Sequence, residues 1–215
     1  MEIAQKINTK GLLFQWIIVN TIMICAIMPV AMFIYGINNT DQGYHNLKNQ
    51  ILVNVLLTTV ISFIFGFFQW QILKPHITTS KKWLWTSFIG LSLGLFIALT
   101  ENYSATDWEV IETNPLLLTA VTIGSTLGIV QWLSLRQHVK WASIWILTNI
   151  LGWSIGLGWS WIFLPTNAND DVGFLSLALF LTYVFVTAIT YSTFTGISLV
   201  WLLNHRSKGS QTTAA

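Results

Sequence analysis

The sequence predicts an all-α polytopic membrane protein, a bundle of six transmembrane helices arranged as three repeated hairpins with both termini in the cytoplasm. Its composition is the first observation behind this prediction. A soluble domain carries about 25% charged residues, whereas only 8% of these 215 residues are charged and 53% are hydrophobic. The number of apolar stretches and the alternating charge of the segments between them are the second and third observations.

Six apolar stretches are close to or above the length of about 20 residues that a helix needs to cross a bilayer. They fill most of the chain, so we expect a single transmembrane domain over residues 1–215. The first stretch is too long for a cleaved signal peptide, and we expect it to be retained as a span. The predicted spans are 11–36, 50–73, 83–100, 115–135, 141–164 and 173–203.

The segments between these spans alternate in charge. The two tails together with 74–82 and 136–140 hold nine Lys or Arg residues and one acid, while 37–49, 101–114 and 165–172 hold seven acids and one Lys. Short loops rich in Lys and Arg stay cytoplasmic. The pattern therefore predicts an even number of spans and cytoplasmic termini.

Tryptophan is abundant, with 12 residues in the chain. Its indole ring is apolar and its N–H needs a polar partner, so tryptophan is frequent at the membrane interface. We interpret the residues near the predicted inner ends of the spans as an interfacial belt: Trp16, Trp70, Trp83, Trp85, Trp132, Trp141, Trp145 and Trp201.

Short segments recur along the chain, which is the signature of an internal repeat. Residues 66–70 (GFFQW) match residues 128–132 (GIVQW), and residues 16–20 (WIIVN) match residues 145–149 (WILTN). A match between the fourth and sixth spans sets Gly196 opposite Gly128. These matches predict three hairpins, made of spans 1–2, 3–4 and 5–6, around a pseudo-threefold axis.

Small residues four positions apart mark the second, fourth and sixth spans. In lipid, such residues allow helix backbones to approach closely, and the dispersion energy of packing then holds the helices together. We interpret them as helix-packing positions, although a dimer face or the wall of a cavity would use the same residues. They are Ser62, Gly66, Gly124, Gly128, Ser192 and Gly196.

No Asp, Glu, Lys, Arg or His lies in the interior of a predicted span. Proton relays and acid–base catalysis in membranes need such groups, so we assign no catalytic residue and no cofactor. The deep polar residues are amides, which bond across helices in lipid. We interpret Asn20, Asn149, Gln69 and Gln131 as a polar network, with the lining of a cavity for a small amphiphile as the alternative.

Three histidines, His76, His138 and His205, lie just outside the inner ends of spans at related positions. Three histidines can bind zinc. Their basic neighbours, Lys74 and Arg136 among them, repel a cation, and we therefore assign no metal site.

The segment 128–136 (GIVQWLSLR), together with 145–149, resembles a group of bacterial membrane proteins, common in cyanobacteria, that carry repeated GxxQWLxLR segments. The resemblance covers mainly residues 66–157. It implies a location in a bacterial cell membrane, either the inner membrane or a thylakoid membrane, and brings no known activity.

Together these patterns favour a non-enzymatic integral membrane protein that binds a protein partner or lipid in an assembly, scaffold or envelope role. One alternative is a small carrier or channel for an uncharged or amphipathic solute. A second is a lipid-modifying membrane enzyme that would use the three histidines. The expected partners are membrane lipids and either another protein or a second copy of the chain. A net charge of +2 gives no basic field for a nucleic acid.

Overall fold

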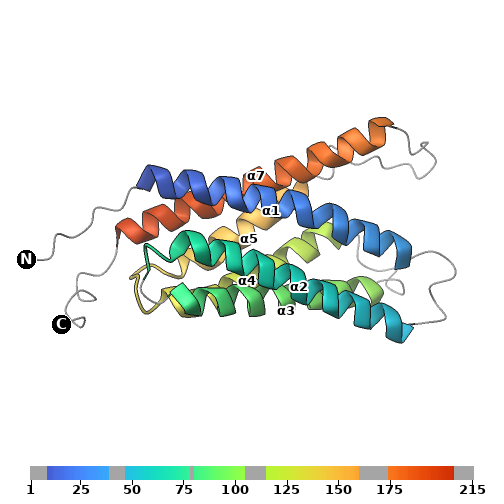
Figure 1. The fold of residues 1–215 in the computed structure, drawn as a ribbon, viewed down its shortest axis with the longest axis horizontal. Helices are drawn as coiled ribbons and strands as arrows, with labels where there is room; N and C mark the ends of the chain where they lie inside the picture. The colour runs from blue at the N-terminus through green and yellow to red at the C-terminus, as the bar shows by residue number, and fades with distance from the viewer. Residues whose placement is uncertain (1–8, 39–46, 78–79, 105–114, 160–173, 206–215) are drawn as a thin grey trace, which may run out of the picture.

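The computed structural model describes residues 9–38, 47–77, 80–104, 115–159 and 174–205. Within these ranges the chain forms helices and turns without β-strands, which confirms the all-helical fold class. Figure 1 shows the helices lying roughly side by side in an elongated bundle. They are α1 (Thr9–Asn38), α2 (Leu47–Leu73), α3 (Ser80–Ser104), α4 (Pro115–Leu135), α5 (Ile144–Gly158) and α7 (Phe174–Asn204).

The six helices form a closed ring. Each one packs against the next along the chain, and α7 packs against α1 to complete the ring. The contact between α1 and α2 is the sparsest of the six. The first residue of α1 and the last residue of α7 lie at the same end of the bundle (Figure 1).

Four helical segments are long and apolar enough to cross a membrane: Thr9–Pro29, Val55–Leu73, Leu117–Leu135 and Leu177–Asn204. The chain therefore has the character of a membrane protein. Apolar α5 has 15 residues, which at the helical rise extend over about 22 Å. Helix α5 begins three residues after the predicted start of the span 141–164, because residues 141–143 belong to turns in which the Ile144 N–H donates to the Trp141 carbonyl at 3.1 Å. Residues 160–164 of that span lie outside the described residues.

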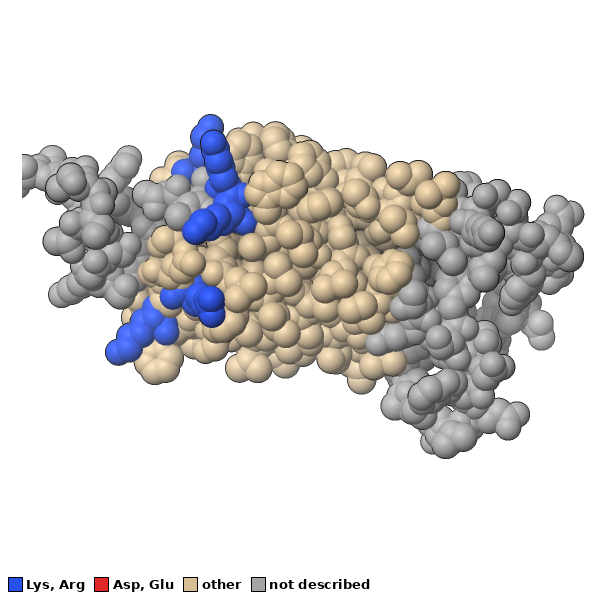
Figure 2. Space-filling model, turned by 90° about the horizontal axis from the view of Figure 1, so that it is seen from below, with Lys and Arg blue, Asp and Glu red and all other residues tan. Residues whose placement is uncertain are grey.

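The outer surface of the bundle is apolar on every helix, with large side chains such as Phe14, Leu56, Ile89, Leu147 and Ile197 exposed. All the described Lys and Arg side chains gather at one end, which we call the basic end (Figure 2). This is the end at which α2, α4 and α7 finish and α1, α3 and α5 begin. An apolar band above a rim of cations is the surface that a bilayer would cover.

Two clusters of buried apolar side chains fill the interior of the ring. One lies at the basic end and includes Trp16, Trp83 and Trp145. The other includes Ile24, Leu91, Trp153 and Tyr191. Ile24, Leu91 and Trp153 each follow one of the three tryptophans by eight residues, so at the helical rise the second cluster lies about 12 Å deeper.

Candidate functional site

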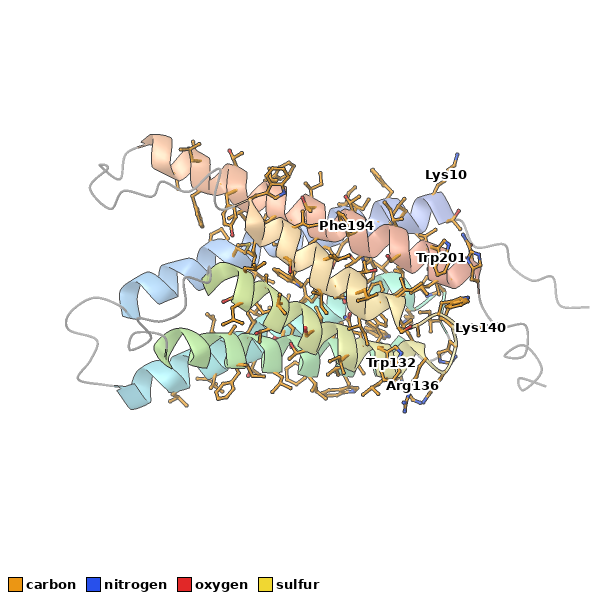
Figure 3. The ribbon with its side chains drawn as sticks, turned by 180° about the vertical axis from the view of Figure 1, so that it is seen from behind. Lys10, Trp132, Arg136, Lys140, Phe194 and Trp201 are labelled. Carbon is orange, nitrogen blue, oxygen red and sulfur yellow. The ribbon has the colours of Figure 1, made fainter. Side chains whose placement is uncertain are left out.

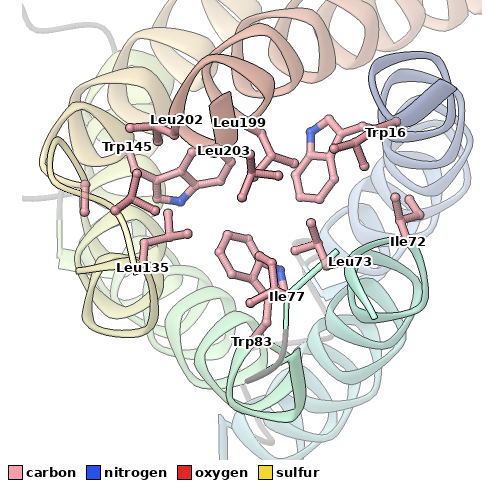
Figure 4. Close-up of a cluster of buried hydrophobic side chains, with 13 residues drawn as sticks. Trp16, Ile72, Leu73, Ile77, Trp83, Leu135, Trp145, Leu199, Leu202 and Leu203 are labelled. Atoms are coloured by element: carbon pink, nitrogen blue, oxygen red, sulfur yellow. The ribbon is translucent and has the colours of Figure 1, made fainter. Parts of the chain in front are cut away.

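Three tryptophans meet on the axis of the ring at the basic end (Figure 4). Trp16, Trp83 and Trp145 come from α1, α3 and α5 and are at most 1% exposed. Their ring centroids lie 6.2 Å (Trp16–Trp83), 6.1 Å (Trp16–Trp145) and 5.5 Å (Trp83–Trp145) apart, with all three pairs edge to face. Aromatic rings favour this geometry because the positive edge of one meets the negative face of another. We call these residues the tryptophan triangle.

The tryptophan triangle corrects the interpretation of all inner-end tryptophans as an interfacial belt. The three side chains are buried because they point from their helices toward the axis of the ring. Trp85, Trp141 and Trp201 are exposed on the outer surface, as an interfacial belt requires. Leu73, Leu135 and Leu199 pack into the same cluster from α2, α4 and α7. The centre of the basic end is therefore filled with side chains.

Each indole of the triangle donates a hydrogen bond to an adjacent helix. The Trp83 Nε1–H donates to Gln69 Oε1 at 3.1 Å, and the Trp145 Nε1–H donates to Gln131 Oε1 at 2.8 Å. The Trp16 Nε1–H donates to the Thr195 hydroxyl at 3.0 Å. A buried indole N–H needs such an acceptor, since an unpaired one costs about 1–3 kcal/mol.

The two glutamines extend these bonds across the ring. Gln69 Nε2 donates to Asn20 Oδ1 at 2.7 Å, which joins α2 to α1. Gln131 Nε2 donates to the Ser87 hydroxyl at 2.8 Å and lies 3.1 Å from Gln69 Oε1. The Ser87 hydroxyl also donates to Gln69 Oε1 at 3.2 Å. One amide oxygen thus accepts from three donors on α3 and α4.

The matched asparagines sit one helical turn beyond two of the tryptophans. Asn20 Nδ2 donates to the Trp16 carbonyl and Asn149 Nδ2 to the Trp145 carbonyl, both at 2.9 Å. Asn149 Oδ1 accepts from the Tyr191 hydroxyl at 3.0 Å, which joins α5 to α7. The structure therefore joins Asn20, Gln69 and Gln131 directly, while Asn149 bonds to Tyr191 instead.

Every helix–helix contact of the ring contains one of these side-chain hydrogen bonds. In ring order, the pairs are Asn20–Gln69, Gln69–Trp83, Ser87–Gln131, Gln131–Trp145, Asn149–Tyr191 and Thr195–Trp16. We call this set the hydrogen-bond belt. All ten of its residues are buried, and none is charged at neutral pH. Such a belt can hold helices in register, but it offers no acid, base or activated nucleophile for chemistry.

The predicted helix-packing residues lie at helix contacts. A Cβ on Gly66 would lie 2.9 Å from the Leu84 carbonyl oxygen of α3, and one on Gly124 would lie 2.7 Å from Ile150 Cα of α5. A Cβ on Gly128 would lie 3.0 Å from Ile146 Cα, and one on Gly196 would lie 3.0 Å from Leu13 Cδ1 of α1.

The two predicted packing serines are fully buried. The Ser192 hydroxyl donates to the Ala188 carbonyl at 2.6 Å. The Ser62 hydroxyl has no hydrogen-bond partner within the described part of the chain.

The register of α7 differs from the sequence match by one helical turn. Setting Gly196 opposite Gly128 would place Leu199 where α4 has Gln131, but the acceptor that α7 offers to the tryptophan triangle is Thr195. Under the shifted register, Gly128 corresponds to Ser192, and Leu135 to Leu199. All four of these residues are buried. A shift of four residues, about one helical turn, keeps the same face of a helix buried, so the sequence match does not distinguish the two registers.

The three histidines do not form a metal site. In the described ranges, no three His, Cys, Asp or Glu side chains are close enough to hold an ion together. His205 stacks on Trp201 with a centroid distance of 4.5 Å, and its Nδ1–H donates to the Trp201 carbonyl at 2.9 Å. His76, His138 and His205 lie in three separate turns that follow α2, α4 and α7.

The connections at the basic end share one geometry. The Lys74 N–H donates to the Trp70 carbonyl and the Arg136 N–H to the Trp132 carbonyl, both at 2.8 Å. Three residues further on, the chain turns inward, and Ile77 and Val139 are buried against the apolar cluster of this end. Figure 3 shows Arg136 and Lys140 with Trp132 and Trp201 near this end.

No protein-family model matches this sequence, and no curated protein or solved structure is significantly similar to it. The geometry of the chain itself is therefore the basis for assigning a function.

Sequence reasoning missed Ser87, Tyr191 and Thr195, which complete the hydrogen-bond belt. One signal could have found Ser87: it follows Trp83 by four residues, as Asn20 follows Trp16 and Asn149 follows Trp145. Tyr191 and Thr195 carry no comparable pattern, because their roles depend on the register of α7.

Proposed function

We propose that this chain is a non-enzymatic integral membrane protein that acts through its outer surface by binding a protein partner or lipid. Six spans, with the basic end in the cytoplasm, are part of the proposal. The observation that carries it is the use of the deep amides: the hydrogen-bond belt engages Asn20, Gln69, Gln131 and Asn149 in joining helices, while the tryptophan triangle fills the axis at the basic end. A protein with this interior has its surface left for recognition.

The repeat also belongs to this proposal. Three pairs support a threefold plan: Trp83 with Gln69, Trp145 with Gln131 and Trp16 with Thr195. Each pair joins a helix to the one that follows it around the ring. The contacts between α2 and α3, α4 and α5, and α7 and α1 therefore describe the repeat better than three hairpins do, since the contact within the first hairpin is the sparsest.

Cross-linking in the native membrane, followed by purification in mild detergent, tests the proposed function. We expect a protein or lipid to be recovered at a fixed ratio to the chain. The contrary result is a bare monomer that moves a neutral solute into vesicles and loses this transport with Asn20→Leu and Asn149→Leu. That outcome would establish the carrier alternative, because these amides would then line a path.

The orientation is tested separately. In sealed membrane vesicles whose cytosolic face points outward, an impermeant reagent should not reach accessibility tags placed in 37–49, 101–114 and 165–172. The same reagent should react with tags placed in 74–82 and 136–140. Acid-rich segments that face the cytosol would overturn the proposed topology.

A further inference from the structure

We propose that the basic end binds anionic phospholipid headgroups at three places, where a basic side chain lies over a tryptophan at the end of α2, α4 and α7. This inference rests on the proposed membrane function and names its ligand class. The pairs are Trp70 with Lys74, Trp132 with Arg136, and Trp201 with His205.

The three pairs share one spacing, with a cation over the indole in two of them and an imidazole ring over it in the third. In each, the base follows the tryptophan by four residues, so one helical turn brings it over the ring. Lys74 Nζ lies 5.5 Å from the Trp70 centroid, and Arg136 Cζ lies 5.1 Å from the Trp132 centroid. The His205 ring lies 4.5 Å from that of Trp201, at 31°.

In the first two pairs, this arrangement holds a positive charge at the headgroup level. The face of an indole attracts a cation, and the ring itself favours the interface between hydrocarbon and water. A base stacked on it is fixed at that depth before a ligand arrives. The three bases are exposed, so Lys74 and Arg136 can donate to a phosphate, for which the planar Arg fork is suited.

The charge around these pairs favours an anion. Lys10, Lys81, Lys82 and Lys140 are exposed at the same end, and Figure 2 shows no acidic side chain there among those the structure describes. In the sequence, the tails before α1 and after α7, together with the segments 74–82 and 136–140, contain nine Lys or Arg and the single acid Glu2. Because α2, α4 and α7 alternate with the other helices around the ring, the three pairs are spread around the rim, where phospholipids of one leaflet would surround the bundle.

Lipid retention by the purified full chain tests the proposal. The protein is exchanged into mixed micelles that contain equal amounts of phosphatidylglycerol and phosphatidylcholine, and retained lipids are counted by native mass spectrometry. We expect up to three phosphatidylglycerol molecules to be held in preference to phosphatidylcholine. Lys74→Gln with Arg136→Gln should lower this preference about 25-fold, since each cation near an anionic surface favours binding about fivefold.

The matched control is Lys10→Gln with Lys81→Gln, which removes the same charge from the same end. In the described structure, neither of these two lysines lies over an indole. We expect the control to lower the preference by no more than about fivefold, the effect of one cation, because no indole holds either lysine at the headgroup level. Equal losses in the two double variants would show diffuse attraction by the whole basic end, and no loss in either would show no headgroup site. Both results overturn the proposal.

Two further measurements distinguish headgroup binding from the binding of soluble phosphate and from helix capping. Glycerol phosphate in solution should not displace the retained lipid, and displacement would identify a site for soluble phosphate instead. A variant that loses stability but keeps its lipid preference would show that Lys74 and Arg136 only cap their helices. Fractionation of each variant with washed membranes tests the proposed membrane function independently, because a chain can remain embedded after its headgroup sites are removed.

Discussion

The α1–α2 contact and the other five contacts of the ring are held in different ways. At each of the five, a glycine brings two helices together: Gly66 at α2–α3, Gly90 and Gly94 at α3–α4, Gly124 and Gly128 at α4–α5, Gly152 and Gly156 at α5–α7, and Gly196 at α7–α1. None of the glycines with defined neighbours faces the α1–α2 contact, which is also the sparsest.

The α1–α2 contact contains instead the shortest cross-helix bond of the belt, from Gln69 Nε2 to Asn20 Oδ1 at 2.7 Å. In lipid, helices gain little from burying apolar surface against each other, so close packing and hydrogen bonds are the available forces. The comparison indicates that a helix contact without a glycine is stabilised mainly by its hydrogen bond. A helix contact that contains a glycine is stabilised mainly by the close packing of the two backbones.

The largest expected effect breaks a glycine contact. Gly124→Ala would place a Cβ 2.7 Å from Ile150 Cα and 2.8 Å from the Asn149 carbonyl oxygen. Backbone atoms cannot rotate away, so α4 and α5 must separate, at a cost of about 3 kcal/mol in the free energy of unfolding. Unfolding by SDS titration in mixed micelles measures it. The control is Gly158→Ala at the end of α5, where a Cβ would meet no atom within 4 Å, and equal losses would refute the role of close approach.

The second largest effect is expected when Gln69 is replaced, because its amide bonds across the α1–α2 contact and also across the α2–α3 contact, where Gly66 packs. Gln69→Leu leaves the Trp83 N–H without its acceptor and deletes the bond to Asn20. We expect a loss of about 2 kcal/mol in unfolding free energy, measured in the same titration. Gln71→Leu is the matched control, because Gln71 is exposed on the same helix. If Gln69→Leu were as stable as the control, the belt would contribute nothing to the ring.

The fold was largely predictable because hydrophobic length and charge are local properties of the sequence. Five of the six predicted spans agree closely with helices, and α4 has the predicted bounds, 115–135. Helix α5 begins three residues after the predicted start of the fifth span at 141, because Trp141 and Ala142 are apolar whether they lie in a turn or in a helix. Ala142 is buried there as part of the inward turn, which hydropathy alone does not distinguish.

The candidate site was predictable in its amides and not in its tryptophans. Asn20, Gln69, Gln131 and Asn149 stood out because an amide in lipid needs a partner. Trp83 and Trp85 are two positions apart and look alike in the sequence, yet one is 1% and the other 55% exposed. Only the rotation of α3 in the ring decides which of them faces the axis, and that rotation depends on the other five helices.

A smaller effect compares the two matched asparagines. Asn20 bonds across the contact without a defined glycine, whereas Asn149 bonds to Tyr191 across α5–α7, where Gly152 and Gly156 also pack. We expect Asn20→Leu to cost about 1 kcal/mol more than Asn149→Leu.

Cys25, the only cysteine, reports on this difference because it lies on α1 beyond Asn20 and packs against the second apolar cluster. Its labelling by a membrane-permeant maleimide should accelerate with Asn20→Leu and stay unchanged with Asn149→Leu. Equal rates in both variants would mean that the two contacts are held alike.

The smallest effect tests whether Thr195 completes the ring as the glutamines do. Thr195→Val removes the acceptor of the Trp16 N–H while keeping the shape of the side chain. We expect a loss of about 1 kcal/mol in unfolding free energy, because one neutral hydrogen bond is broken and the α7–α1 contact keeps its packing at Gly196. Thr182→Val is the control: its hydroxyl also donates to a carbonyl of α7, that of Ala178, but it is exposed. A loss no larger than that of the control would show that packing alone holds α7 to α1, so that the belt is open at this contact and is needed chiefly where glycine is missing.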